Sequence, residues 1–188
     1  IDSYAEVVLT QEGSAAGGLV GDNSNAGTIQ TSFAMGDVNS GLDTPAGGLV
    51  GELDGGAVTD SYATGDITVS APYYVGGLIG TEDRGGLFPP TAKNNYSTGV
   101  VPPPKLHKAS GGSIGYNFGK KENTNLYWDT MTSGTELGVG RGDSGGVTGL
   151  TTAQLQSGLP AGFDPKIWAE NPNINNGFPY LIHNPPPK

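Results

Sequence analysis

The sequence contains no cysteine among its 188 residues. Disulfide scaffolds and thiolate metal sites are therefore excluded. It also lacks any run that approaches the roughly 20 apolar residues of a membrane span, and no charged-then-apolar leader precedes the first segment. We therefore expect no membrane insertion, no metal and no other cofactor. The chain starts within a repeated pattern, at Ile1 rather than Met, which predicts that it is part of a longer protein.

Positive charge is scarce as well. Nine Lys and Arg residues stand against 18 Asp and Glu residues, which gives a net charge of −9. Phosphate binding needs clustered Lys and Arg, so a nucleic-acid partner is excluded, and so is electrostatic attachment to anionic lipid. Only 35% of the residues are hydrophobic. Such a thin core fits stacked repeats better than a compact globule.

Glycine is abundant, with 33 residues, and it is periodic. The phrase GGLVG occurs at Gly17–Gly21 and Gly47–Gly51, GGLIG at Gly76–Gly80, and a degraded copy, GGSIG, at Gly111–Gly115. An aromatic residue recurs at steps of 29, 29, 34 and 31 residues, at Tyr4, Phe33, Tyr62, Tyr96 and Tyr127. A fixed period near thirty is the signature of a repeat architecture.

Short strand-like stretches separated by Gly, Asn, Asp and Ser clusters predict β-structure, and no helical period is present. About 29–35 residues with three strands match one coil of a β-solenoid, in which equivalent residues stack ~4.8 Å apart. The aromatic residues should then form a ladder in the core, and the glycine pairs should occupy corners where positive φ or close backbone approach excludes a Cβ. A second, aliphatic ladder is predicted from Val20, Val50, Ile79 and Ile114.

The repeats are predicted to occupy residues 1–126, followed by a C-terminal capping segment at 127–182 and a Pro-rich tail at 183–188. Within the capping segment, Thr151 and Gln154 form a capping box for a short helix, and Gly158 stands where that helix should stop. The segment is rich in large apolar residues such as Phe163 and Trp168. We expect it to seal the open end of the solenoid, since an uncovered terminal coil would expose unpaired edges.

Three stretches depart from the repeat and are the candidates for specific binding: Arg84–Pro90, Val101–Lys108 and Arg141–Gly146. Proline confines the first two to loops. Two further candidates, Asp37 and Asp66, lie 29 residues apart and should stack. A cation between such opposed carboxylates is conceivable, but without a calcium-binding nonapeptide pattern solvated loop carboxylates are the preferred interpretation.

The third stretch contains two known short motifs. GDSGG at Gly142–Gly146 is like the nucleophile segment of chymotrypsin-like proteases, in which Ser144 would need a His and an Asp. Neither His107 nor His183 has a recognisable context, so a Gly-rich loop is the favoured interpretation. Arg141-Gly142-Asp143 is the tripeptide that integrin ligands display, but tripeptides arise easily by chance in glycine-rich chains.

Two sets of residues carry a family resemblance. GGLVG followed by SYATG resembles the GLUG motif of bacterial surface proteins. Tyr127-Trp128-Asp129, Gly149–Gln154 and Gly177–Leu181 resemble the segment that follows such repeats in large secreted exoproteins of the filamentous-haemagglutinin type, which two-partner secretion exports. The resemblance implies a right-handed parallel β-helix in an adhesin-like protein that is secreted to the bacterial cell surface. It carries over no catalytic residue.

The favoured function is a non-catalytic adhesin stalk or binding segment, which contacts a surface protein or glycan of a host or neighbouring cell or captures a secreted host protein. The alternative is a carbohydrate-active β-helix enzyme of the pectinase or lyase kind, which needs converging carboxylates and often a basic partner. The candidate bases Arg84, Lys93 and Lys105 have no obvious acids near them in the sequence. Convergence of acidic and basic side chains in one cleft would favour the enzyme. A protease fragment around Ser144 is the third hypothesis.

Overall fold

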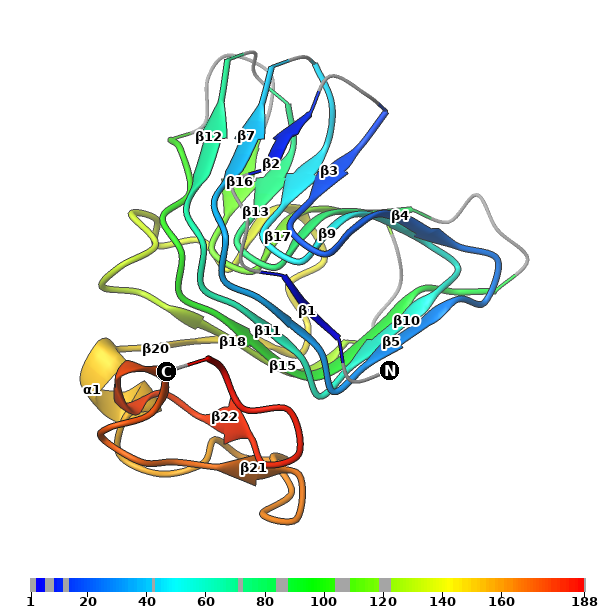
Figure 1. Ribbon diagram of the computed structural model, residues 1–188. Helices are drawn as coiled ribbons and strands as arrows, with labels where there is room; N and C mark the ends of the chain where they lie inside the picture. Colours follow the sequence, from blue (N-terminus) through cyan, green and yellow to red (C-terminus); the bar gives the residue numbers. More distant parts are fainter. Residues whose placement is uncertain are drawn as a thin grey trace.

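The computed structural model describes residues 3–5, 9–11, 14–41, 43–70, 73–83, 88–103, 109–118 and 123–187 (Figure 1). Within these residues the protein is all-β, and its strands run parallel except for one C-terminal pair. The helical segments are α1 (Thr152–Leu155) and the 3-10 turn η1 (Asn175–Gly177). The β-fold predicted from the turn-rich, non-helical sequence is therefore confirmed.

The parallel strands of the described residues form four sheets, A to D, and each copy of the glycine phrase joins two of them. One sheet, sheet C, contains the strands that end in the first glycine of each phrase: β3 (Ala16–Gly17), β8 (Ala46–Gly47), β13 (Val75–Gly76) and β16 (Ser110–Gly111). The other, sheet D, contains the strands that begin at the second aliphatic residue: β4 (Val20–Ser24), β9 (Val50–Asp54), β14 (Ile79–Asp83) and β17 (Ile114–Asn117), followed by β19 (Val139–Gly142). The phrase is thus the corner between sheets C and D.

Close backbone approach, rather than positive φ, is the reason for glycine at these corners. A Cβ on Gly47 would lie 1.9 Å from the Val50 carbonyl oxygen, and one on Gly48 would lie 2.2 Å from the Gly77 carbonyl oxygen. Neither residue has a positive φ. Any larger residue would therefore push apart both the corner and the next repeat.

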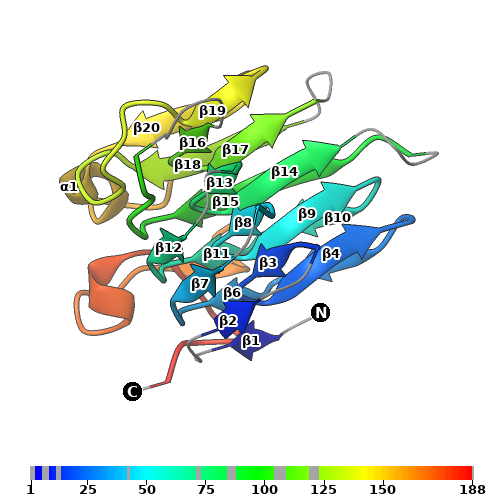
Figure 2. The ribbon, with the colours of Figure 1, turned by 90° about the horizontal axis from the view of Figure 1, so that it is seen from above.

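The remaining parallel strands complete each repeat (Figure 2). Sheet A contains β1 (Tyr4–Ala5), β6 (Phe33–Ala34), β11 (Tyr62–Ala63), β15 (Thr91–Ser97), β18 (Thr124–Asp129) and β20 (Val147–Leu150), with β5 (Thr28–Gln30) and β10 (Ala57–Thr59) joined to it through β15. Sheet B contains β2 (Leu9–Gln11), β7 (Val38–Ser40) and β12 (Ile67–Val69). Each sheet therefore takes one or two strands from successive repeats.

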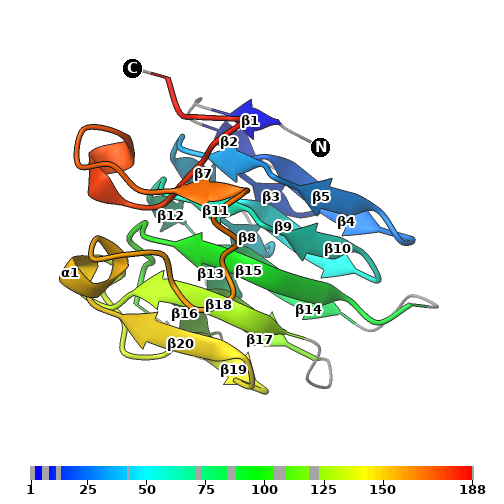
Figure 3. The same cartoon turned by 90° about the horizontal axis from the view of Figure 1, so that it is seen from below.

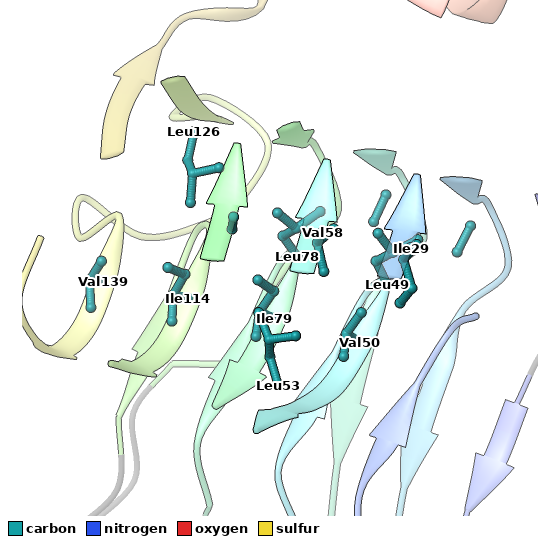
Figure 4. Close-up of a cluster of buried hydrophobic side chains, with 13 residues drawn as sticks. Ile29, Leu49, Val50, Leu53, Val58, Leu78, Ile79, Ile114, Leu126 and Val139 are labelled. Atoms are coloured by element: carbon teal, nitrogen blue, oxygen red, sulfur yellow. The ribbon is translucent and has the colours of Figure 1, made fainter. Parts of the chain in front are cut away.

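The register between repeats follows the sequence period. Val20 pairs with Val50, Val50 with Ile79, and Ile79 with Ile114, so the predicted aliphatic ladder is confirmed and Val139 extends it. Figure 4 shows the ladder from Val50 to Val139 gathered with the side chains of Leu49, Leu53, Leu78 and Leu126 in the interior between the sheets. Stacking the repeats thus builds one continuous apolar core.

A single indole fills the interior at the end of the stack. In the earlier repeats the equivalent position holds Ala34, Ala63 or Ser97, whereas β18 has Trp128 and the final strand β20 has Gly149. The space for this ring comes from Gly112 and Gly138, where an added Cβ would lie 2.1 Å and 2.4 Å from the indole. Trp128 therefore fills the interior next to the final strand, whose own residue at this position has no side chain.

The C-terminal residues, which the sequence predicted to seal the open end, instead run back along one side of the stack (Figure 3). Strand pairing continues through β20, so the capping segment that the sequence placed from Tyr127 begins in the structure at about Thr151. We call residues 151–187 the lateral segment; it contains α1, η1 and the antiparallel pair β21 (Trp168–Ala169) and β22 (Tyr180–Leu181). The lateral segment packs on the side of the stack where the aromatic ladder lies, because its apolar residues and the rings of the ladder bury one another there.

Hydrogen bonds hold both ends of the lateral segment. Thr151 and Gln154 form the predicted capping box at the start of α1, and the Thr152 hydroxyl donates to Asp129 Oδ2 at 2.7 Å. At the other end, Asn184 Nδ2 donates to the carbonyl oxygens of Ser3 at 3.2 Å and Thr31 at 3.1 Å. The segment therefore spans the stack from the last repeat to the first.

Candidate functional site

Two of the three non-repeating loops lie partly outside the described residues. Residues 84–87 of the first and 104–108 of the second fall there, together with the candidates Arg84, Lys105 and His107. Of what remains, Phe88 is exposed and Val101 is buried. Lys93 is exposed on β15, where its register neighbours are Thr59 and Thr124 rather than acids.

The GDSGG loop connects β19 to β20 in the last repeat. The Asp143 carboxylate accepts the Gly145 N–H at 2.8 Å, and the Asn117 side chain donates to the Asp143 carbonyl oxygen at 3.0 Å. His183 lies at the other end of the stack, beside Thr31 in the first full repeat. Among the described residues, Ser144 therefore has no histidine placed to accept its proton, and the loop has the geometry of a glycine turn, with φ of 103° at Gly142 and 78° at Gly146.

Both charged side chains of the Arg-Gly-Asp tripeptide make contacts within the protein. Arg141 belongs to β19, and its guanidinium carbon lies 5.1 Å from the centre of the Tyr116 ring, within cation–π range. Asp143 bonds within its own loop, as described above. The tripeptide is therefore a strand end followed by a turn, and its use by an integrin stays a prediction.

Asp37 and Asp66 are links between repeats. The Asp66 N–H donates to Asp37 Oδ1 at 2.9 Å, and the Val100 N–H donates to Asp66 Oδ1 at 2.8 Å. Both residues are exposed, as the preferred interpretation of solvated carboxylates predicted, and each carboxylate also satisfies a backbone donor of the next repeat. Among the described residues no cluster of three or more acidic or histidine side chains suits a metal ion.

The aromatic ladder is confirmed in register, and its rings are buried from Phe33 to Tyr127, whereas Tyr4 at its open end is 54% exposed. Its rings stack at 5.2, 4.8 and 5.0 Å between Tyr4, Phe33, Tyr62 and Tyr96. The lateral segment covers it with Leu155, Phe163, Trp168, Phe178 and Leu181. The Tyr96 hydroxyl donates to the Pro179 carbonyl oxygen at 2.6 Å, and the Trp168 indole donates to Asp60 Oδ1 at 3.2 Å. Burial raises the pKa of the Tyr96 hydroxyl well above its usual value.

A second set of rings lies on the outer side of sheet D, and sequence reasoning missed it. The outer cluster consists of Tyr73, Tyr74, Tyr116 and Phe118. Consecutive ring centres are 4.9, 4.7 and 3.5 Å apart. The three tyrosines are half-buried, and Phe118 is 44% exposed. No member belongs to the buried clusters of the described residues.

The outer cluster forms because the corner brings two sheets together. Tyr73 and Tyr74 precede β13 in sheet C, whereas Tyr116 and Phe118 belong to β17 and its extension in sheet D. The position of Tyr116 is polar in the preceding repeats, where the register partners are Thr81, Glu52 and Asp22. That replacement of a polar residue by an aromatic one was the available sequence signal.

Carboxylates occupy the same outer face beside the rings. Glu52 lies among Asp22, Asp54 and Asp83 on β4, β9 and β14, and we call these four the acidic group. Partial burial, followed by repulsion from Asp22, Asp83 and Asp54, raises the pKa of the Glu52 carboxyl. The Thr81 hydroxyl lies in the row between Glu52 and Tyr116, is 4% exposed as a residue, and has no hydrogen-bond partner among the described residues.

A buried carboxyl, that of Glu82, lies on the inner side of β14. Glu82 is 2% exposed, and its register partners are Leu53 and Asn117. Asn123 Nδ2 donates to Glu82 Oε2 at 2.7 Å, whereas Oε1 has no partner among the described residues. Burial raises the pKa of this carboxyl to about 7, although the hydrogen bond from Asn123 opposes the shift. Glu82 faces the core and is not part of a ligand site.

A hollow of 430 Å³ lies between the lateral segment and its tail. Its walls include Met35, Ile174, Asn175 and residues 185–187, and no ionisable side chain lines it. It therefore supplies no group for acid–base or metal chemistry. The outer face of sheet D, with its rings, carboxylates and Arg141, is the better candidate site.

Comparison with known proteins finds one family feature. The GLUG motif matches residues 46–68. That stretch begins at the second glycine phrase and ends within β12, so it supports the repeat part of the resemblance. The motif occurs in extracellular and surface proteins. No curated protein and no solved structure matches the chain. Neither helical segment of the described residues is long and apolar enough to cross a membrane.

Proposed function

We propose that the chain is a non-catalytic binding module of a secreted bacterial surface protein, in which stacked repeats form a rigid stalk and the non-repeating outer surface contacts a partner. The observation that carries the proposal is a division between two kinds of position. The repeating positions form the core and the ladders, whereas the outer cluster follows no repeat and lies outside the buried clusters of the described residues. The GLUG match supports an extracellular setting.

The same proposal includes the finer architecture. Parallel pairing at the repeat period supports a closed, right-handed β-solenoid of the filamentous-haemagglutinin type, exported by two-partner secretion. The partner in this setting is a surface protein or glycan of a host or neighbouring cell. An experimental structure in which successive coils turn left-handed, or fail to close, would remove the architectural part.

Retention on cells tests the binding role. The fluorescently labelled 188-residue chain is incubated with animal and bacterial cells, and bound label is measured after washing. The proposal predicts saturable retention on at least one cell type, because a module that acts in attachment must bind a surface component. Absence of saturable retention on all of them would contradict it.

One observation favours a carbohydrate-active enzyme as the second candidate. The acidic group places Glu52, whose pKa is raised, among three further carboxylates, and such pairs of carboxylates with different pKa values carry out glycoside hydrolysis. Release of reducing ends or unsaturated sugars from polysaccharides, lost in Glu52→Gln, would establish this function in place of the non-catalytic one. A serine-directed fluorophosphonate that fails to label Ser144 would dismiss the protease hypothesis.

A further inference from the structure

The outer cluster lies outside the buried core of the described residues. Its four rings touch one another, yet none packs into the buried clusters of the described residues. The aromatic ladder shows that this fold covers rings when they serve stability. Contiguous exposed apolar side chains on a protein surface commonly mark a binding site.

The rings suit the apolar face of a sugar. An aromatic face carries partial negative charge, so it attracts the partly positive C–H groups of a pyranose ring. Tyr116 and Phe118 lie with ring centres 3.5 Å apart at an interplanar angle of 31°, and Tyr74 continues the row beyond Tyr116. A row of adjacent rings can therefore contact successive units of one chain.

The polar groups beside the rings suit the hydroxyls of a sugar. Glu52 shares a register row with Tyr116, separated from it by Thr81, and its carboxylate accepts hydrogen bonds. Arg141 is the neighbour of Tyr116 on the other side of that row and donates hydrogen bonds. The Thr81 hydroxyl lies in the same row between them, but it is buried, so Glu52 and Arg141 are the groups offered to a sugar.

Charge and size narrow the ligand class. The acidic group repels anionic polymers, as does the net charge of −9. A stable protein interface buries about 800 Å² on each partner. The 44% exposed Phe118 and the three half-buried tyrosines offer less than roughly 300 Å², if a fully buried ring contributes about 200 Å². That area is small for a folded protein but sufficient for a few sugar units.

We propose that the outer face of sheet D binds a neutral oligosaccharide chain, with Tyr116 and Phe118 packing against sugar rings and with Glu52 and Arg141 hydrogen-bonding to sugar hydroxyls. The inference rests on the proposed binding role of the module and assigns its ligand class and site. It places recognition on β9, β14, β17 and β19, away from the lateral segment.

Calorimetric titration of the 188-residue chain with neutral hexasaccharides of glucose, mannose and N-acetylglucosamine tests this site. At least one hexasaccharide should bind, and Phe118→Ala should weaken it about tenfold, the equivalent of one lost stacking contact. Phe88→Ala is the matched control, because Phe88 is 55% exposed but lies outside the outer cluster. It should leave the affinity unchanged. Glu52→Gln should weaken binding as well, since it replaces a charged acceptor.

Hexalysine is titrated in parallel, as a cationic peptide that the acidic group could attract. Three results would overturn the inference: no binding of any neutral hexasaccharide, equal losses in Phe118→Ala and Phe88→Ala, or Phe118-dependent binding of hexalysine without binding of any sugar. If cells retain the chain while the hexasaccharides do not bind, the proposed function stands and this site assignment fails. If a hexasaccharide is bound and cleaved, the site assignment stands and the non-catalytic part of the proposed function fails.

Discussion

The molecule holds two groups of aromatic side chains that differ in almost every respect. The aromatic ladder repeats at the sequence period, stacks in register on sheet A and is buried by the lateral segment from Phe33 to Tyr127. The outer cluster follows no period, joins sheets C and D and stays partly exposed. A repeat thus fixes which rings stabilise the stack, while departures from the repeat are free to serve binding. Predictions that separate stability from binding test this division.

The largest loss of stability is expected from a substitution on the side of the stack that the lateral segment covers. Trp168→Ala should lower the free energy of unfolding by about 4 kcal/mol, because it removes a fully buried indole that touches Tyr62 and Tyr96. Urea denaturation followed by circular dichroism measures the loss. Equal stability of Trp168→Ala and wild type would show that the lateral segment is not a structural cover.

Glu82 is a buried residue that departs from the repeat, so its titration tests whether such a departure also affects stability. The folded-state pKa is raised to about 7 from 4.5, so the folded protein retains a proton that the unfolded chain loses as pH rises between these values. Stability should therefore fall by about 3 kcal/mol across this window and change no further above it. Denaturation midpoints at pH 4.5 to 8 should show this decline in wild type and a flatter profile in Glu82→Gln. Matching profiles would contradict the assignment.

The corner glycines test the repeating element itself. Gly47→Ala should cost about 2 kcal/mol, because the new Cβ would lie 1.9 Å from a backbone oxygen that cannot move alone. Gly21→Ala is the matched comparison within the same phrase, since its nearest atom lies at 3.1 Å. Its loss should be smaller in the same urea denaturation. A larger loss for Gly21→Ala than for Gly47→Ala would reject the close-approach explanation.

The smallest effect on stability is expected on the exposed side. Phe118→Ala should change the free energy of unfolding by less than about 0.5 kcal/mol, because a 44% exposed ring at a strand end contributes little burial. Thermal unfolding monitored by circular dichroism provides the comparison with Phe88→Ala. A loss near that of Trp168→Ala would make the outer cluster a structural element.

Much of the fold could be predicted from the sequence because the signals for it are local and repeat along the chain. The steps between Val20, Val50 and Ile79 predict the ladder directly, since equivalent residues must pair when repeats stack. The capping box at Thr151 is predictable for a similar reason, because both partners lie within three residues. Period and local spacing therefore predicted sheets, register and the short helix.

Two features could not be predicted from the sequence because they depend on contacts that the repeat period does not specify. One is the packing of the lateral segment over the ladder, and the other is the outer cluster. Tyr96 meets Pro179 across 83 residues, so nothing near either residue showed that the lateral segment would pack on the side of the stack. Trp128 could be placed in the interior only once its register with Ser97 was known. Tyr74 and Tyr116 meet because the corner folds one sheet against the next. Asp37 and Asp66 were correctly aligned, but their backbone partners were not foreseen.

The division between rings that stabilise and rings that bind can be tested in one experiment, the thermal unfolding of wild type and Phe118→Ala, each with and without the tightest-binding neutral hexasaccharide. Without sugar the two melting temperatures should agree within about 2 °C, the equivalent of about 0.5 kcal/mol. At about a hundredfold excess of sugar over the dissociation constant, wild type should rise by roughly 5 to 10 °C and the variant by clearly less. A variant that melts more than about 5 °C lower without sugar, or equal shifts with sugar, would contradict this division.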